Sequence, residues 1–452
     1  MSRQLVLGTL VIIVLAPLAA GQTTGTALRA PPQVPEDKCV ELVVMLDTHT
    51  SVIAVSAKAA TQVLASEPGV NMHLLESVDK IPVSQAADFV AQVGQLPGVL
   101  SAEMLRPVGV PEIEACGEPL GTSAQQCSIS FADGSPSDDE FHSQEALAYM
   151  PYGKVARWSF NQHQPVLVAV IDTGIDPGHP ALVGHVAQSG WDFVSGRPGA
   201  IDVANGLDDD HDGWIDESYG HGTFLASVVM LINPDASILP LRVLDADGNG
   251  NSFNVADAIY YAADHGAQVI NLSLSMSDPS SAVACAMEYA RYKGAAIYVA
   301  AGNTSKEKVL FPANYDPSIF KWGPCLPEDW VPSAATVTAV ASTDAEGIKA
   351  DFSAWGPEVD IVTPGIGIYG AMPGGGYAWW SGTSMSAAVA SGVGSLVDSV
   401  VGAYALQHGT PSVIKVTAWS VDKINQAYTG GLGEGFVNAA KASYAAWVLT
   451  QP

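Results

Sequence analysis

Basic residues are scarce in this sequence. Its 452 residues hold 19 Lys and Arg against 46 Asp and Glu, which gives a formal net charge of -27. Such an acidic surface repels nucleic acid and anionic membranes, so we expect neither as a partner. Charged residues of both signs are also few, at 14%, whereas hydrophobic residues reach 48%. This balance is typical of a globular chain with a large core and excludes a disordered one.

Cysteines are few, and no two of them have the spacing of a zinc site. The five are Cys39, Cys116, Cys127, Cys285 and Cys325. An oxidising compartment would permit disulfides between them. Our working pairs are Cys116 with Cys127 and Cys285 with Cys325, which leaves Cys39 unpaired, although the sequence does not assign the pairs.

After the first twenty residues, no apolar run is long enough to cross a bilayer. The N-terminal run, residues 5–18, follows Arg3 and ends at the small residues 19–21. This pattern predicts a signal peptide, a secreted protein and no stable membrane insertion after signal removal. The alternative is an uncleaved membrane anchor, for which the run is short.

Changes of composition along the chain predict five segments. They are a signal peptide (1–21), a linker (22–37), a small α/β module (38–110), a polar linker (111–143) and a large domain (144–452). Within the small module we expect strands at 39–46 and 99–105 and helices at 55–66 and 84–93. Gly, Ser, Asp and Gln dominate residues 117–143, so we expect an exposed and cleavable segment there.

Continuous apolar runs recur in the large domain. They end at Asp172, Asp245, Ser275, Asn303 and Asp344. Runs of this kind suit strands that are buried on both faces. Helical patterns lie between several of them, at 221–232, 253–265 and 281–292. The alternation predicts a doubly wound, mostly parallel α/β sheet with helices on both faces, and a site beyond the carboxyl ends of its strands.

Four residues of this domain suit acyl transfer. Asp172 and Asn303 follow predicted strands, and His221 and Ser384 begin predicted helices. A Ser hydroxyl needs a base, His is suited to that task near neutral pH, and a carboxylate on the far imidazole nitrogen fixes the tautomer. An Asn amide and a helix N-terminus both favour a developing oxyanion. Alone, each residue has an ordinary structural explanation, as a turn Asp, a buried His or a helix cap. Together they favour catalysis.

The stretches around these residues resemble the motifs of the subtilisin-like serine proteases, the subtilases. They are VAVIDTGID, GHGTFLASVV and SGTSMSAAVASGVGSLV, in the family's order of Asp, His and Ser, with AAGN resembling its oxyanion Asn motif. The resemblance covers residues 144–446. It implies that Ser384 is the nucleophile, His221 the general base and then acid, Asp172 its orienter and Asn303 the oxyanion donor.

The stretch INLSLS resembles the family's substrate-binding strand. The resemblance implies a substrate-binding role for Ser273, Leu274, Ser275 and Gly302, with the peptide bound as an added strand. The sequence departs from the family at four positions. Ala388 stands where the family usually has a Pro, and Ser227 stands where it usually has a Gly. Ser275 and Met276 stand where the substrate strand of the family has Gly residues. The last two replacements put the subsite preference in doubt.

An acidic stretch, residues 205–218, has the alternating oxygen spacing of a calcium loop. Its candidate ligands are Asp208, Asp210, Asp212 and Asp216, with Gly213 at the turn. The Glu expected at the last position is replaced by Tyr219. We expect either a stabilising Ca²⁺ without a part in the chemistry or a solvated acidic loop.

The small module resembles a subtilase propeptide in size, position and strand-helix content. The resemblance implies that it assists folding and blocks the cleft until it is cut. A permanently attached accessory domain is the alternative.

We therefore predict a secreted serine endopeptidase, made as a precursor, that hydrolyses polypeptides through an acyl-enzyme on Ser384 and has its own propeptide as an intramolecular inhibitor. A catalytically silent binding or scaffolding protein with the same fold is the alternative. A calcium-dependent adhesion protein would account only for the acidic loop. An α/β-hydrolase elbow fits less well, because Ser386 stands where that motif needs its second Gly.

Overall fold

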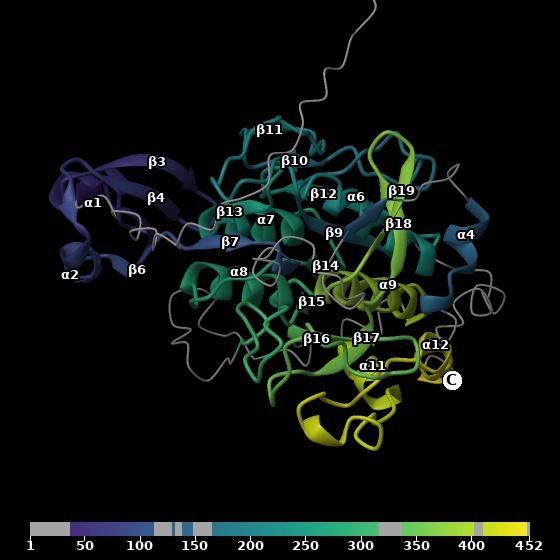
Figure 1. The fold of residues 1–452 in the computed structure, drawn as a ribbon. Helices are drawn as coiled ribbons and strands as arrows, with labels where there is room; N and C mark the ends of the chain where they lie inside the picture. Colours follow the sequence, from purple (N-terminus) through teal and green to yellow (C-terminus); the bar gives the residue numbers. More distant parts are fainter. Residues whose placement is uncertain are drawn as a thin grey trace, which may run out of the picture.

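The computed structural model describes residues 37–112, 129–131, 138–147, 165–315, 337–401 and 410–449. They form a large unit around one sheet and a small unit that projects from it (Figure 1). The predicted signal peptide lies outside the described residues. Among those that are described, no helix is both apolar and long enough to span a bilayer.

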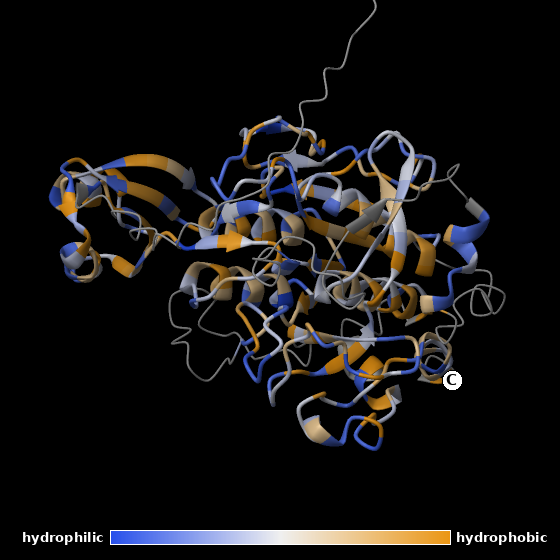
Figure 2. Ribbon diagram, viewed as in Figure 1, coloured by the Kyte–Doolittle hydropathy of each residue, from blue (hydrophilic) through white to orange (hydrophobic). Residues whose placement is uncertain are grey.

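The large unit is built on an eight-stranded sheet. Its order is β11 (Arg197–Pro198), β10 (Trp191–Asp192), β12 (Ser237–Arg242), β9 (Leu167–Asp172), β14 (Val269–Leu272), β15 (Ala296–Ala300), β16 (Val337–Thr343) and β17 (Ile361–Pro364). Only β11 runs antiparallel to its neighbour. The inner strands are buried almost throughout, which explains their unbroken apolar sequences. Figure 2 shows the hydropathy of these sequences along the ribbon.

Helices cover both faces of this sheet (Figure 1). On one face α6 (His221–Ile232) packs against α9 (Thr383–Val401), which in turn contacts α11 (Thr410–Thr417) and α12 (Ala439–Leu449). On the other face α7 (Ser252–Asp264) packs against α8 (Ser281–Tyr292). Every residue of α6 is buried, so its sequence is apolar all round. The predicted doubly wound, mostly parallel α/β fold is confirmed.

A three-stranded sheet lies beside α6 and includes part of the predicted polar linker. It consists of β18 (Ile368–Met372), β19 (Gly376–Trp380) and β8 (Ile129–Phe131). The helix α4 (Asp138–Ser143) and the 3₁₀ turn η1 (Glu145–Leu147) follow. Phe141 of α4 is 2% exposed and contacts the ring of Tyr377. The structure thus differs from a plain linker here, because two pieces of the segment join the large unit.

The small unit has its own four-stranded antiparallel sheet. Its order is β3 (Thr61–Glu67), β4 (Met72–Ser77), β2 (Glu41–Leu46) and β6 (Val99–Met104), with α1 (Val52–Ala59) and α2 (Val83–Gly94) packed against it and a short pair, β1 (Asp37–Lys38) and β5 (Ile81–Pro82), beside it. The predicted helix 55–66 is wrong in its second half. Ala60 adopts a left-handed conformation at φ 52°, which ends the helix, and the next residues pair with β4, a strand that the sequence analysis missed.

The two units are joined by a strand that runs along the large one. This strand, β7 (Pro107–Gly109), pairs antiparallel with β13 (Asn249–Asn251). Near it, Glu103 of β6 accepts hydrogen bonds from Ser280 Oγ and from the backbone N–H groups of Ser281 and Ala282. A carboxylate of the small unit therefore caps the N-terminus of α8 in the large one.

Two cysteines can be placed. Cys39 is free, and Cys285 is disulfide-bonded to a partner outside the described residues. The remaining three, Cys116, Cys127 and Cys325, also lie outside the described residues. The pairing of Cys285 with Cys325 stays a prediction.

Candidate active site

The four predicted catalytic residues meet at the carboxyl edge of the sheet. Asp172 is the last residue of β9, and Asn303 follows the end of β15. His221 begins α6 and Ser384 lies in the first turn of α9. Parallel strands bring their carboxyl ends to one edge, and the helices that return from them begin there. This explains how residues distant in the sequence are brought together.

Asp172 and His221 form a buried hydrogen-bonded pair. His221 Nδ1 lies 2.8 Å from Asp172 Oδ1, and neither residue is exposed. The same oxygen accepts the N–H of Thr173 at 2.8 Å. The ring of Trp380 meets His221 edge-on at 5.1 Å and helps to exclude water. The carboxylate therefore fixes which imidazole nitrogen carries the proton and leaves Nε2 facing Ser384's side of the cleft.

Ser384 and His221 both face one carboxylate oxygen. Ser384 Oγ donates to Glu112 Oε2 at 2.8 Å, and His221 Nε2 lies 3.6 Å from the same atom. The hydroxyl and the imidazole are thus within a few ångströms of one point in space. Glu112 comes from the segment that joins the two units, and it is 5% exposed.

Asn303 points its amide N–H toward the same carboxylate. Its Oδ1 accepts from the N–H of Thr383 at 3.0 Å and from Thr383 Oγ1 at 2.9 Å. With the oxygen held in this way, Nδ2 faces the cleft and donates to Glu112 Oε1 at 3.3 Å. Thr383 therefore orients the side chain that can supply an oxyanion donor.

Glycine at position 382 makes room for the Glu112 carboxylate. A Cβ atom at Gly382 would collide with Glu112 Oε1. The two oxygens of Glu112 thus occupy the space between the Ser384 hydroxyl and the Asn303 amide. A carboxylate in that place resembles the negatively charged oxygen that acyl transfer generates there.

The segment before Glu112 lies along the cleft as an extra strand. Gly109 and Ser275 exchange both backbone hydrogen bonds, at 3.0 and 2.7 Å, and the N–H of Val110 donates to the carbonyl of Gly248 at 3.2 Å. The chain is therefore paired on both sides. Val110 is not exposed at all.

The predicted substrate-binding residues have different places around this strand. Ser275 pairs with it through its backbone, whereas Ser273 Oγ donates to the carbonyl of Ser384 at 2.9 Å and Leu274 is fully buried. Gly302 has φ 102°, and its N–H donates to Thr383 Oγ1 at 3.2 Å. A side chain at that φ would be strained.

The two helix departures have local accommodations. Ser227 Oγ donates to the carbonyl of Phe224 at 2.7 Å and accepts from the N–H of Ala371 at 2.9 Å. It thereby ties α6 to β18. Ala388 is fully buried within α9, where Ala is the best helix former.

Opposing effects set the pKa of His221. Burial lowers it, but the bonded carboxylate of Asp172 and the nearby carboxylate of Glu112 outweigh burial and raise the pKa to about 10. An imidazole in this environment stays protonated at neutral pH and is a poor base. Removing Glu112 from the cleft would remove one of the two charges that hold the proton.

Three of the four predicted calcium ligands lie together. Oxygen atoms of Asp208, Asp210 and Asp212 are within 4.8 Å of one another, and Gly213 takes the turn at φ 103°. Asp216 does not join them, because its carboxylate accepts the N–H groups of Asn205 and Gly206 at 2.8 and 2.9 Å. The loop lies directly before α6, which begins at His221.

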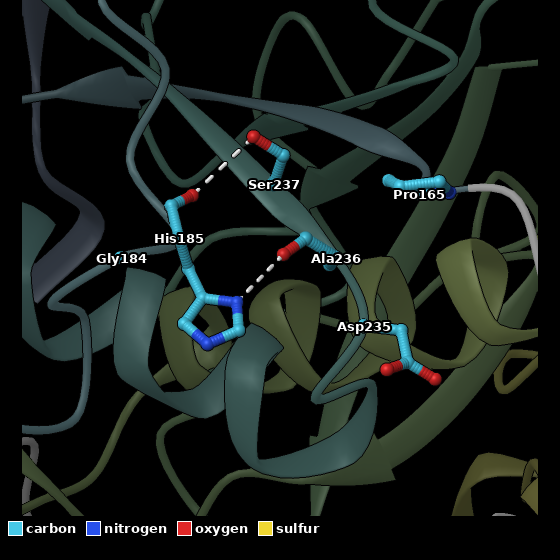
Figure 3. A pocket seen from close by; sticks show the side chains of 6 residues that line it. All are labelled: Pro165, Gly184, His185, Asp235, Ala236 and Ser237. Atoms are coloured by element: carbon cyan, nitrogen blue, oxygen red, sulfur yellow. Dashed lines mark hydrogen bonds between the residues drawn. The ribbon is translucent and has the colours of Figure 1, made fainter.

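A surface hollow lies at the opposite edge of the sheet (Figure 3). It is lined by Pro165, Gly184, His185, Asp235, Ala236 and Ser237. Pro165 and Ser237 lie at the N-terminal ends of β9 and β12, whereas the triad lies at their carboxyl ends. The hollow therefore has no part in the chemistry of Ser384.

Two residues of the site were missed in the sequence. Glu112 falls in the segment predicted to be a linker, where no motif marks it. Asp202, which lies behind the triad, is one of many acidic residues in an irregular loop. No local pattern distinguishes either residue, because both reach the site through tertiary contacts.

A parallel α/β sheet with a buried Asp-His pair, a Ser hydroxyl and an oriented amide at its carboxyl edge defines a serine endopeptidase. A profile of the subtilase family matches residues 163–431. The chain belongs to this family, as its motifs predicted.

Known relatives agree with this assignment. Thermitase from Thermoactinomyces vulgaris is 35% identical over 252 residues, which are 54% of this chain and 78% of that protein. A thermophilic serine proteinase from Bacillus sp. (strain AK1) is 34% identical over 51% of this chain and 52% of its own length. Subtilisin BL from Lederbergia lenta is 30% identical over 62% of this chain and 90% of its own.

A solved structure resembles both units together. It is fervidolysin from Fervidobacterium pennivorans, described as a keratinolytic enzyme related to subtilisin. The TM-score is 0.66 and the match covers 92% of this chain and 62% of that one. At 20% identity it supports the fold alone.

The charge of Glu112 generates a prediction for His221. In the uncut Ser384→Ala protein, Glu112→Gln should lower the pKa of His221 from about 10, because one of two facing carboxylates becomes neutral. A raised His pKa adds stability that is full below the unfolded value of 6.5 and is lost as pH rises through the folded pKa. In Glu112→Gln this loss should therefore be smaller and should be complete at a lower pH. NMR titration of the imidazole and thermal melts across pH measure both. Glu76→Gln, in β4 of the small unit, is the control. An unchanged His221 titration in Glu112→Gln would contradict this explanation of the raised pKa.

Proposed function

We propose that the chain is an exported serine endopeptidase, made as a precursor whose small N-terminal unit blocks its own cleft. The observation that carries this proposal is the placement of Ser384 Oγ and His221 Nε2 around one oxygen, with Asn303 Nδ2 beside it. The N-terminal apolar run supports export. The backbone at Ser275, which here pairs with Gly109, is of the kind that takes up an extended polypeptide as an added strand.

Each residue of the site has one step in the proposed reaction. Ser384 Oγ attacks the carbonyl carbon of the peptide while His221 Nε2 takes the hydroxyl proton, and Asp172 stabilises the imidazolium that forms. Asn303 Nδ2 donates to the oxyanion of the tetrahedral intermediate. Collapse breaks the C–N bond, and His221 returns the proton to the departing amine. Water then attacks the acyl-enzyme by the same route and frees Ser384.

The small unit is the proposed intramolecular inhibitor. Its outgoing strand takes the place of a substrate strand against Ser275 and Gly248, and its Glu112 lies in the oxyanion position. The carboxylate of Glu103 adds a second attachment at the N-terminus of α8. Because a side-chain carboxylate lies where a scissile carbonyl would have to be, Ser384 has no bond to attack at this point.

Peptidase activity is tested with a fluorophosphonate probe and an unfolded protein substrate. We expect the wild type to label and to hydrolyse the substrate, and Ser384→Ala to do neither, with activity lower by about 10⁶-fold. Ser399→Ala, near the other end of the same helix, is the matched control and should label. A binding or scaffolding protein would label in none of the three, and that result would reject the proposal.

Latency is tested by removing the carboxylate from the cleft. In the uncut precursor, Glu112→Ala should increase the rate of fluorophosphonate labelling by roughly 10–100-fold, since hydrogen bonds to a charged group are each worth about 1.5–3 kcal/mol. Labelling is followed on the full-length band of a denaturing gel, so cut and uncut chains are counted separately. Glu76→Ala should label at the wild-type rate. Equal rates for Glu112→Ala and the wild type would show that Glu112 does not hold the cleft closed.

We also propose that the acidic loop binds a stabilising Ca²⁺. Its support is the cluster of three carboxylates together with the Asp208 oxygens, which accept the N–H groups of Asp212 and Gly213 at 3.1 Å. These bonds curl the loop around its own carboxylates. The ion would hold the loop before α6 and would take no part in the reaction.

Calcium binding is tested by thermal melting of the Ser384→Ala protein, which cannot digest itself. A concentration of Ca²⁺ a hundredfold above Kd adds about 2.7 kcal/mol to the free energy of unfolding, which raises the Tm of a domain of this size by roughly 4 °C. Asp210→Asn should remove the rise, whereas Asp235→Asn, at the other edge of the sheet, should keep it. Equal melting with Ca²⁺ and with a chelator would mean that the loop is only a solvated acidic segment.

A further inference from the structure

A second buried carboxylate lies directly behind the triad. Asp202 is 6% exposed and sits in the loop that bridges back to Ile175 through backbone hydrogen bonds of 2.9 and 3.0 Å. It is separated by 19 residues from His221 and belongs to no motif of the sequence analysis. The steps of the reaction proposed above give it no role.

One oxygen of Asp202 joins the two segments that carry the catalytic pair. Its Oδ2 accepts the N–H of Gly220 at 2.9 Å and the hydroxyl of Thr173 at 3.1 Å. Thr173 directly follows Asp172, and Gly220 directly precedes His221. The Thr173 hydroxyl in turn accepts the N–H of Gly222 at 3.1 Å. Asp202 and Thr173 together therefore join the end of β9 to the start of α6.

The turn that Asp202 holds needs such an anchor. Gly220 has φ 94°, a left-handed conformation that Gly adopts without strain. Gly220 directly precedes His221, so its backbone conformation sets where the imidazole lies. In this network Asp202 is the acceptor of the Gly220 N–H. Without that bond the turn before His221 would be free to move, and the imidazole with it.

The other oxygen of Asp202 is buried and has no hydrogen-bond partner among the described residues. Burial, and then the charge of Asp172, raise the pKa of Asp202 to about 8. The other ionisable groups that face it are Arg242, whose guanidinium donates to Asp192 at 3.1 Å, and Tyr219. A neutral Asn could accept the same two hydrogen bonds without this cost. At neutral pH this carboxyl is therefore largely protonated, and its Oδ2 still accepts the hydrogen bonds from Gly220 and Thr173.

We propose that Asp202 is a positioning residue for peptide hydrolysis. Its carboxylate holds Thr173 and Gly220 so that His221 Nδ1 stays aligned with Asp172 Oδ1. The inference rests on the proposed peptidase activity.

The test compares Asp202→Ala, Asp202→Asn and the wild type as the secreted full chain. Active sites are counted with the fluorophosphonate probe, and kcat and KM are measured with a peptide anilide. We expect Asp202→Ala to lose about 10²-fold in kcat, the effect of a misplacement near 1 Å, with KM within about threefold. Asp202→Asn should recover part of the loss, because it keeps the acceptor and lacks the charge.

The pH profile separates positioning from a purely structural role. In the wild type, kcat should change as Asp202 ionises near pH 8, and Asp202→Asn should lack this step because an amide does not ionise. In the Ser384→Ala background, stability from the protonated Asp202 is lost as pH rises toward about 8, and Asp202→Asn should lack this loss. The matched control is Asp360→Asn, because Asp360 also accepts a backbone N–H, from Ala339 at 2.9 Å.

Two outcomes would overturn the inference. One is wild-type kcat in both variants, with the same dependence on pH near 8 and only the melting temperature changed, because Asp202 would then be structural. The other is a loss confined to KM, because Asp202 would then act on substrate binding. A wild type that neither labels nor hydrolyses would instead reject the proposed function, so the two failures are distinguishable.

Discussion

The structure around the site depends on the hydrogen bond between Asp172 Oδ1 and His221 Nδ1. Both groups are removed from water, so each is costly to bury without the other. This requirement fixes where β9 must end and where α6 must begin, and the parallel sheet brings those two points to one edge. The position of Ser384 then follows from the packing of α9 against α6.

The fold and the meeting of the four predicted site residues were predictable from the sequence because their signals are local. Apolar runs such as the one ending at Asp172 correspond to buried parallel strands, and the helices at 221–232 and 281–292 match α6 and α8 residue for residue. Strand ends and helix starts are therefore visible in the sequence, and the site lies where they meet. The family motifs add the roles of the individual side chains.

Tertiary contacts explain what the sequence did not reveal. Thr61–Glu67 has residues that suit either a helix or a strand, and pairing with β4 decides for the strand. Glu112 and Asp202 are ordinary acidic residues of irregular segments, and only folding places them 2.8 Å from Ser384 Oγ and 2.9 Å from the Gly220 N–H. The polar stretch before α4 was read as a linker because its pairing partner, β19, is more than two hundred residues away.

The two-sided pairing of the segment in the cleft has a consequence for the timing of activation. Severing the backbone beyond residue 112 breaks none of the hydrogen bonds to Ser275 and Gly248, nor the cap that Glu103 places on α8. If the small unit is the inhibitor proposed above, cutting and release are separate steps. Under that proposal, the delay between the cut and activity depends on how long the fragment stays folded around its own small core.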